Sequence, residues 1–100
     1  MMHSDLEQFL QHYAELVLIN LWERSGEASL DMDRLMHDVE RTLPIPVLRL
    51  RLTEHREWAR MHGIYGTPAL LAYYRGQPLF RCMGRITLDE LLHRLRRLEL

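Results

Sequence analysis

The chain has 100 residues, of which 47% are hydrophobic, so it can build the core of one domain but not of two. Its 13 basic and 14 acidic residues leave a formal net charge of -1, which gives no general attraction to nucleic acid or to a membrane surface. A single cysteine excludes an internal disulfide and a cysteine-only metal site. Residues 1–5 show no secretory signal pattern, so we expect one cytoplasmic domain spanning residues 1–100.

The first elements are a helix and a buried strand. Ser4 and Glu7 form a capping box ahead of apolar residues at helical spacing, which predicts a helix over 4–14. Residues 16–22 form a short, nearly continuous apolar run. Such a run is typical of a strand that is covered on both faces, as in a parallel sheet.

A second helix follows a polar loop. Residues 23–28 contain a glycine and are mostly polar, which indicates the loop. Ser29 is then expected to cap a helix over 30–43, whose apolar residues recur at helical spacing. Pro44 and Pro46 end this helix.

The middle of the chain is predicted to form a strand and then a short helix. Residues 47–52 alternate between apolar and charged side chains, which predicts a strand. Thr53 is expected to cap a short helix that runs to about Met61, and Gly63 is expected to end it.

A hairpin and a last helix complete the pattern. Residues 69–74 and 79–83 predict two strands joined by a tight turn over 75–77, with Pro78 suited to an edge strand. Thr87 and Glu90 form a second capping box, ahead of a leucine stripe that reaches Leu98. The order α-β-α-β-α-β-β-α therefore predicts an α/β fold of three layers, with a mixed four-stranded sheet between helices.

One long segment carries a family resemblance. Residues 62–77 read HGIYGTPALLAYYRGQ, and they are followed by a break at Gly84 and a capped last helix. With Trp22 after the first strand, this pattern resembles the thioredoxin superfamily over about residues 16–98. The resemblance implies a cis peptide bond between Thr67 and Pro68. It also implies a groove in which the backbone of Thr67 pairs with an extended peptide or with glutathione.

The resemblance fails at the redox motif. Trp22 matches the family, but Gly26 and Ser29 stand at the two cysteine positions, and Asn20 stands where the family keeps a buried aspartate. Thiol–disulfide exchange needs a thiolate of lowered pKa and a second thiol that resolves the mixed disulfide. Neither glycine nor serine supplies one, and an asparagine cannot accept a proton as a carboxylate does. We therefore expect a redox-inactive module without dithiol chemistry.

The function implied by the resemblance is binding. Accessory and chaperone-like members of the superfamily, including the hydrogenase-maturation type, hold a protein or an extended peptide. By resemblance, the groove residues here are Trp22, Ser25, Gly26, Ser29, Tyr65, Thr67, Pro68 and Gly84.

Two alternatives stay open. Cys82 could serve a monothiol enzyme or a glutathione-dependent redox protein, with Arg81 and Arg85 beside it, or it could simply be a buried small side chain. The chain could also form a homodimer through the strand edge at 79–83 or through the first helix. We expect no cofactor and no metal, because the six histidines show no tight ligand spacing.

Overall fold

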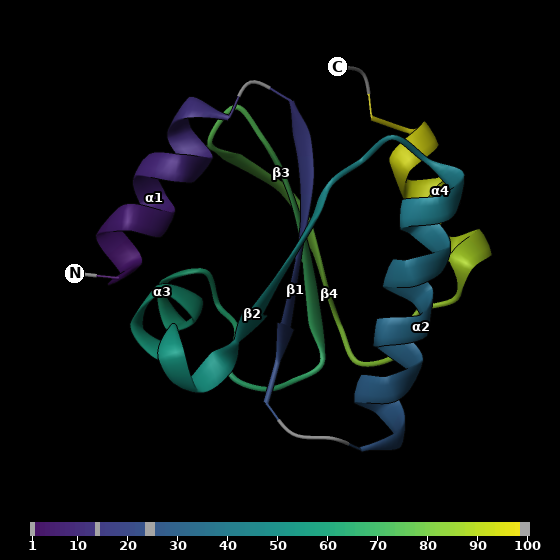
Figure 1. The fold of residues 1–100 in the computed structure, drawn as a ribbon, viewed down its shortest axis with the longest axis horizontal. Coiled ribbons are helices and arrows are strands. Elements are labelled where there is room, and N and C mark those ends of the chain that lie inside the picture. The colour runs from purple at the N-terminus through teal and green to yellow at the C-terminus, as the bar shows by residue number, and fades with distance from the viewer. Residues whose placement is uncertain (1, 14, 24–25, 99–100) are drawn as a thin grey trace.

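A computed structural model describes residues 2–13, 15–23 and 26–98, with only the backbone described over 2–5 (Figure 1). Its elements follow the predicted order of helices and strands, with a short 3₁₀ turn, η1, added after the second strand. They are α1 (Met2–His12), β1 (Leu16–Trp22), α2 (Glu27–Thr42), β2 (Val47–Arg51), η1 (Leu52–Glu54), α3 (Arg56–Met61), β3 (Ala69–Tyr74), β4 (Gln77–Met83) and α4 (Leu88–Arg96).

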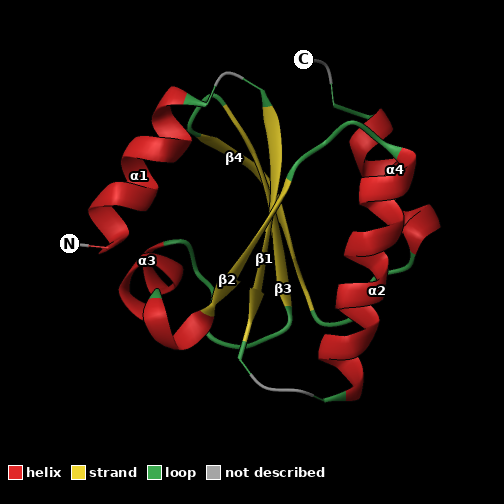
Figure 2. Cartoon of the chain, in the orientation of Figure 1, coloured by secondary structure: helices red, strands yellow, loops and turns green. Residues whose placement is uncertain are grey.

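The four strands form one mixed sheet in the order β2-β1-β3-β4. β1 and β2 run parallel, whereas β1 with β3 and β3 with β4 run antiparallel. Figure 2 shows α1 and α3 on one face of the sheet and α2 and α4 on the other. The predicted three-layer α/β architecture is therefore confirmed.

Each face of the sheet carries its own hydrophobic core. β1 serves both cores, because Val17, Ile19 and Leu21 pack on the α1 and α3 side while Leu18 packs on the α2 and α4 side. All four side chains are almost completely buried. Burial of one such side chain is worth about 1.5–3 kcal/mol, which explains why β1 contains an almost unbroken apolar run.

Three predicted helix starts are wrong. α1 already begins at Met2, so Ser4 lies inside the helix and does not cap it. α2 begins at Glu27, because Gly26 is extended (φ -157°, ψ 169°) and its carbonyl accepts the N–H of Leu30 at 2.8 Å. Ser29 therefore lies in the first turn of α2 and is not its cap.

The third error concerns Thr53. Here the chain forms η1, in which the N–H of His55 donates to the carbonyl of Leu52 at 3.0 Å. α3 starts only at Arg56, so Thr53 lies within the 3₁₀ turn and cannot cap α3.

The predicted end of α3, the predicted cap of α4 and the predicted cis-proline are confirmed. Gly63 adopts a left-handed φ of 74° directly after α3, and Thr87 caps α4 by accepting the N–H of Glu90 at 3.1 Å. The Thr67–Pro68 peptide bond is cis. β4 begins at Gln77, earlier than predicted, so Pro78 lies within this edge strand. No helix in the described ranges is long and apolar enough to cross a membrane.

Candidate functional site

Several elements meet at one end of the sheet, which we call the Pro68 end. Antiparallel pairing sets Leu21 near the end of β1 beside Ala69 at the start of β3. The N–H of Gly84, just after β4, donates to the carbonyl of Pro68 at 2.9 Å. Figure 1 shows the end of β1, the start of β3 and the end of β4 together at the bottom of the view.

The start of α2 belongs to the same end. Arg85 lies 3.5 Å from the carboxylate of Glu27 and 3.5 Å from that of Asp31, both in the first turns of α2. Each of these side chains is largely exposed, so the ion pairs contribute little to stability. They nevertheless place the beginning of α2 next to Gly84, and hence next to Pro68.

Most of the residues expected from the resemblance therefore lie at the Pro68 end. Pro68 itself is buried, whereas Thr67 and Gly84 are partly exposed. Ser25 lies outside the described residues. Of the other expected residues, Trp22 ends β1, Gly26 and Ser29 lie at the start of α2, and Tyr65 lies in the loop before β3.

Trp22 is already engaged by a neighbour. The guanidinium of Arg51, its register partner on β2, lies 4.5 Å from the centre of the indole ring. This distance is within the range of a cation–π interaction. The contact orients Trp22 at the end of β1 and leaves the indole partly exposed.

The Pro68 end is open and partly apolar. A Cβ added at Gly26, Gly66 or Gly84 would meet no atom within 4 Å. Two large apolar side chains nearby, Tyr65 and Met83, are 76% and 51% exposed. Exposed apolar groups beside free backbone favour contact with another chain.

The backbone of Thr67 is free to pair. Residue 67 lies just before β3, and no other described residue donates to its C=O or accepts from its N–H. Thr67 is also partly exposed. Its two backbone groups can therefore take one extended segment by β-type hydrogen bonds.

The start of α2 offers no redox chemistry. Gly26 at the N-cap has no side chain, and the only functional group of Ser29 is a hydroxyl. Asn20 on β1 is only 3% exposed, and its Oδ1 finds no hydrogen-bond partner among the described residues. An amide at this position cannot take a proton from a thiol.

Cys82 lies on β4 and not on α2. It pairs with Leu70 across β3 and β4, packs in the core on the α2 and α4 side, and is 9% exposed. Burial raises the pKa of its thiol, and the nearby guanidinium of Arg94 offsets that effect only in part. The thiolate that monothiol chemistry requires is therefore disfavoured.

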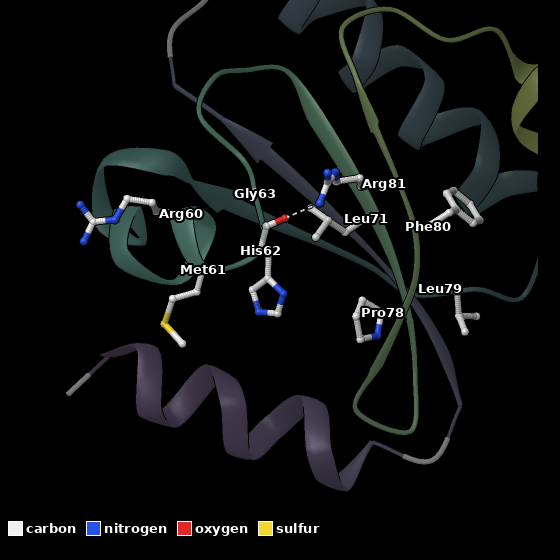
Figure 3. A pocket seen from close by; sticks show the side chains of 9 residues that line it. All are labelled: Arg60, Met61, His62, Gly63, Leu71, Pro78, Leu79, Phe80 and Arg81. Carbon is white, nitrogen blue, oxygen red and sulfur yellow. Dashed lines mark hydrogen bonds between the residues drawn. The ribbon is translucent and has the colours of Figure 1, made fainter.

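The sequence did not indicate the cavity that Figure 3 shows, with a volume of about 610 Å³. The guanidinium of Arg81 crosses this cavity and donates to the carbonyl of His62 at 3.0 Å. Gly63 permits that contact, because a Cβ there would lie 2.7 Å from the Arg81 guanidinium. The cavity is lined by Arg60, Met61, His62, Gly63, Leu71, Pro78, Leu79, Phe80 and Arg81.

A partly buried polar contact adjoins this cavity. The hydroxyl of Tyr73 lies 2.8 Å from Nδ1 of His62, and the imidazole packs against the Trp58 ring at 4.4 Å between centres, with the ring planes tilted by 46°. Burial raises the pKa of Tyr73, with a smaller contribution from Glu7. Across the described residues, no group of three His, Cys, Asp or Glu side chains is arranged to hold a metal ion.

Comparison with known proteins identifies the fold. No protein-family model matches the sequence, and no curated protein matches it. Among solved structures, a reduced thioredoxin pre-protein from Schistosoma mansoni is 18% identical with a TM-score of 0.78, covering 93% of this chain and 89% of that one. A mutant thioredoxin from Halobacterium salinarum is 16% identical with a TM-score of 0.76, covering 88% and 77%.

A third similar chain comes from a structural study of thiol resolution in yeast mitochondrial 1-Cys peroxiredoxin through glutathione and thioredoxin systems. It is 12% identical with a TM-score of 0.80, covering 95% of this chain and 89% of that one. At these identities the likeness concerns the fold alone. The chain has a thioredoxin-like fold.

Proposed function

We propose that this chain is a redox-inactive binding module, which holds an extended peptide or a segment of a partner protein at the Pro68 end. In this role it acts as an accessory or chaperone-like protein. The observation that carries the proposal is the combination of an open backbone at Thr67 with the lack of any thiol at Gly26 and Ser29.

The geometry supports binding by strand addition. An extended segment beside Thr67 gains main-chain hydrogen bonds, and its side chains reach Tyr65 and Met83 on the exposed surface. Aromatic residues and methionine are enriched at protein interfaces, and methionine adapts to varied partners. A site of this kind favours the extended shape of a ligand over one fixed sequence.

The chemistry of the chain argues against dithiol exchange. A single cysteine cannot form and resolve an internal disulfide. That cysteine is buried in a core on β4, and its thiol pKa is raised. Turnover in a dithiol-dependent insulin reduction assay should therefore stay at the background rate.

The test uses random peptides displayed on phage and selected on the full-length protein. We expect the recovered peptides to bind the wild-type chain, and to shift the amide resonances of Thr67 and Gly84 in an NMR titration. Gly66→Trp should weaken their binding at least about tenfold, because the open space at residue 66 lets the indole occupy the site without disturbing the fold.

The matched control is Gln77→Trp, which places the same side chain on an exposed residue at the far end of the hairpin. Gln77→Trp should bind the peptides as the wild type does. Equal binding by Gly66→Trp, or resonance shifts confined to other parts of the chain, would place the binding surface elsewhere.

A further inference from the structure

β2 forms an edge of the sheet that no described helix or strand covers. In the strand order β2-β1-β3-β4, it has β1 as its one neighbour. Figure 1 looks along the row of strands with β2 nearest to the viewer, and no helix passes in front of it. An open edge presents unpaired N–H and C=O groups, and so is a template for another strand.

The pairing with β1 fixes which backbone groups of β2 point outward. The N–H of Leu18 donates to the carbonyl of Pro46 at 3.0 Å, in a parallel register that aligns Leu18 with Val47. Because residues of a parallel strand face their neighbour alternately, the β1-facing groups belong to even-numbered residues. The N–H and C=O groups of Val47 and Arg49 and the N–H of Arg51 therefore point away from β1, whereas the C=O of Arg51, the N-cap of η1, accepts the first bond of that turn.

The opposite edge is protected, whereas β2 is not. β4 contains Pro78, which has no N–H to donate, and its pairing with β3 shifts register between Ala72 and Tyr73. Prolines and bulges of this kind discourage further pairing. β2 contains no proline, and its register with β1 is continuous from Val47 to Arg51.

Charge on β2 does not repel a like strand, because Arg49 is paired within its own chain. Its Nη2 lies 2.8 Å from Oε1 of Glu40, and its Nε lies 3.3 Å from Oδ1 of Asp33, both on α2. The pKa of Glu40 is lowered by the hydrogen bond from Arg49. Two copies of Arg49 can therefore approach with their charges already compensated.

We infer that the β2 edge pairs with the β2 edge of a second copy of this chain. The strands run antiparallel about a two-fold axis at Arg49, which aligns Val47 of each copy with Arg51 of the other. The two sheets then continue into one. The two-fold axis at Arg49 lies on the far side of β1 from β3, although Arg51 at the end of β2 contacts Trp22.

Side chains and strand ends suit this symmetric pairing. Leu48 and Leu50, which pack only partly against the core on the α1 and α3 side, meet each other across the axis. Each strand is bounded by Pro46 at one end and by η1, starting at Leu52, at the other. In the two-fold arrangement Pro46 of one copy faces Leu52 of the other, so the two paired strands end at matching positions. A self-complementary edge of equal length is what an isologous dimer requires.

The test compares Arg51→Pro with Arg51→Ala by sedimentation equilibrium at concentrations up to about 1 mM. The backbone at Arg51 has φ -79°, close to the value that proline requires, and its N–H points away from β1. Arg51→Pro thus removes an edge donor from each copy while the sheet stays intact. Arg51→Ala removes the same side chain but keeps that donor.

We expect the wild type to dimerise and Arg51→Pro to weaken the dimer at least about tenfold, with Arg51→Ala within about threefold of the wild type. Thermal unfolding of the three proteins reports whether each is folded. In hydrogen exchange, the amides of Val47 and Arg49 should become slower with rising concentration, while those of Leu48 and Leu50 stay slow throughout. A monomer at the highest concentration, or a dimer that Arg51→Pro leaves unchanged, would overturn the inference.

Discussion

Replacing Asn20 by leucine should stabilise the protein. Asn20 lies in the middle of β1, on the same face as Leu18, and is only 3% exposed. Its Oδ1 has no hydrogen-bond partner among the described residues. A buried acceptor without a partner costs about 1–3 kcal/mol, because the group loses its hydrogen bond to water on folding and gains nothing in return.

Leucine removes this cost with little change of shape, since both side chains branch at Cγ into two heavy atoms. The methyl groups also gain burial in the core on the α2 and α4 side, next to Leu70 in the register of β3. The expected gain in the free energy of unfolding is about 1–2 kcal/mol. For a domain of this size, each kcal/mol raises Tm by roughly 4–8 °C.

Urea denaturation followed by circular dichroism measures this change, and an unchanged m value would show that the compactness of the two states is the same. Asn20→Ala is the control, because it also deletes the oxygen but leaves a cavity, so it should be less stable than Asn20→Leu. A leucine variant that folds normally, but is no more stable than the wild type, would mean that the oxygen of Asn20 is satisfied. Burial of an unpaired acceptor in β1 would then be refuted.

Three further predictions concern the thiols and one helix cap. The double substitution Gly26→Cys and Ser29→Cys should create dithiol exchange in the insulin assay, because both thiols would lie at the N-terminus of α2, where a thiolate is stabilised. If the variant folds and forms a disulfide but shows no turnover, this geometry is wrong. Stability should fall as the pH rises above about 8.5, because folded Cys82 keeps its proton while the unfolded thiol ionises. Cys82→Ala should flatten this slope, and equal slopes would contradict the raised pKa. Thr87→Ala should lower the free energy of unfolding by about 1 kcal/mol in urea denaturation, because Glu90 loses its capping acceptor; an unchanged midpoint would show that the cap adds nothing.

The strands are predictable from the sequence because burial on two faces leaves a strong pattern. The predicted strands over 69–74 and 16–22 coincide with β3 and β1, since both are apolar almost throughout. Helix starts are less predictable. Gly26 begins α2 with no side-chain cap, whereas Ser29, the residue with the suitable hydroxyl, lies one turn too late. A capping residue indicates a start only where the backbone turns at that residue.

The cavity beside Arg81 and the open edge at β2 could not be predicted from the sequence, for a different reason. Arg81 and His62 are far apart in the sequence, and only the packing of β4 against the end of α3 brings them together. Likewise, residues 47–51 show the same alternation whether their strand is central or at an edge. Only the order of strands in the sheet makes β2 an edge, and no local pattern reports that order.

The proposed binding site at the Pro68 end and the missing dithiol chemistry at the start of α2 depend on different parts of this chain. In the proposed function the ligand lies beside Pro68 and Gly84, which are joined by a backbone hydrogen bond that needs no reactive side chain. Gly26 and Ser29 at the start of α2 supply no thiol, and a Cβ added at Gly26 would meet no atom within 4 Å. The proposed function therefore rests on the free backbone at Thr67 rather than on the start of α2.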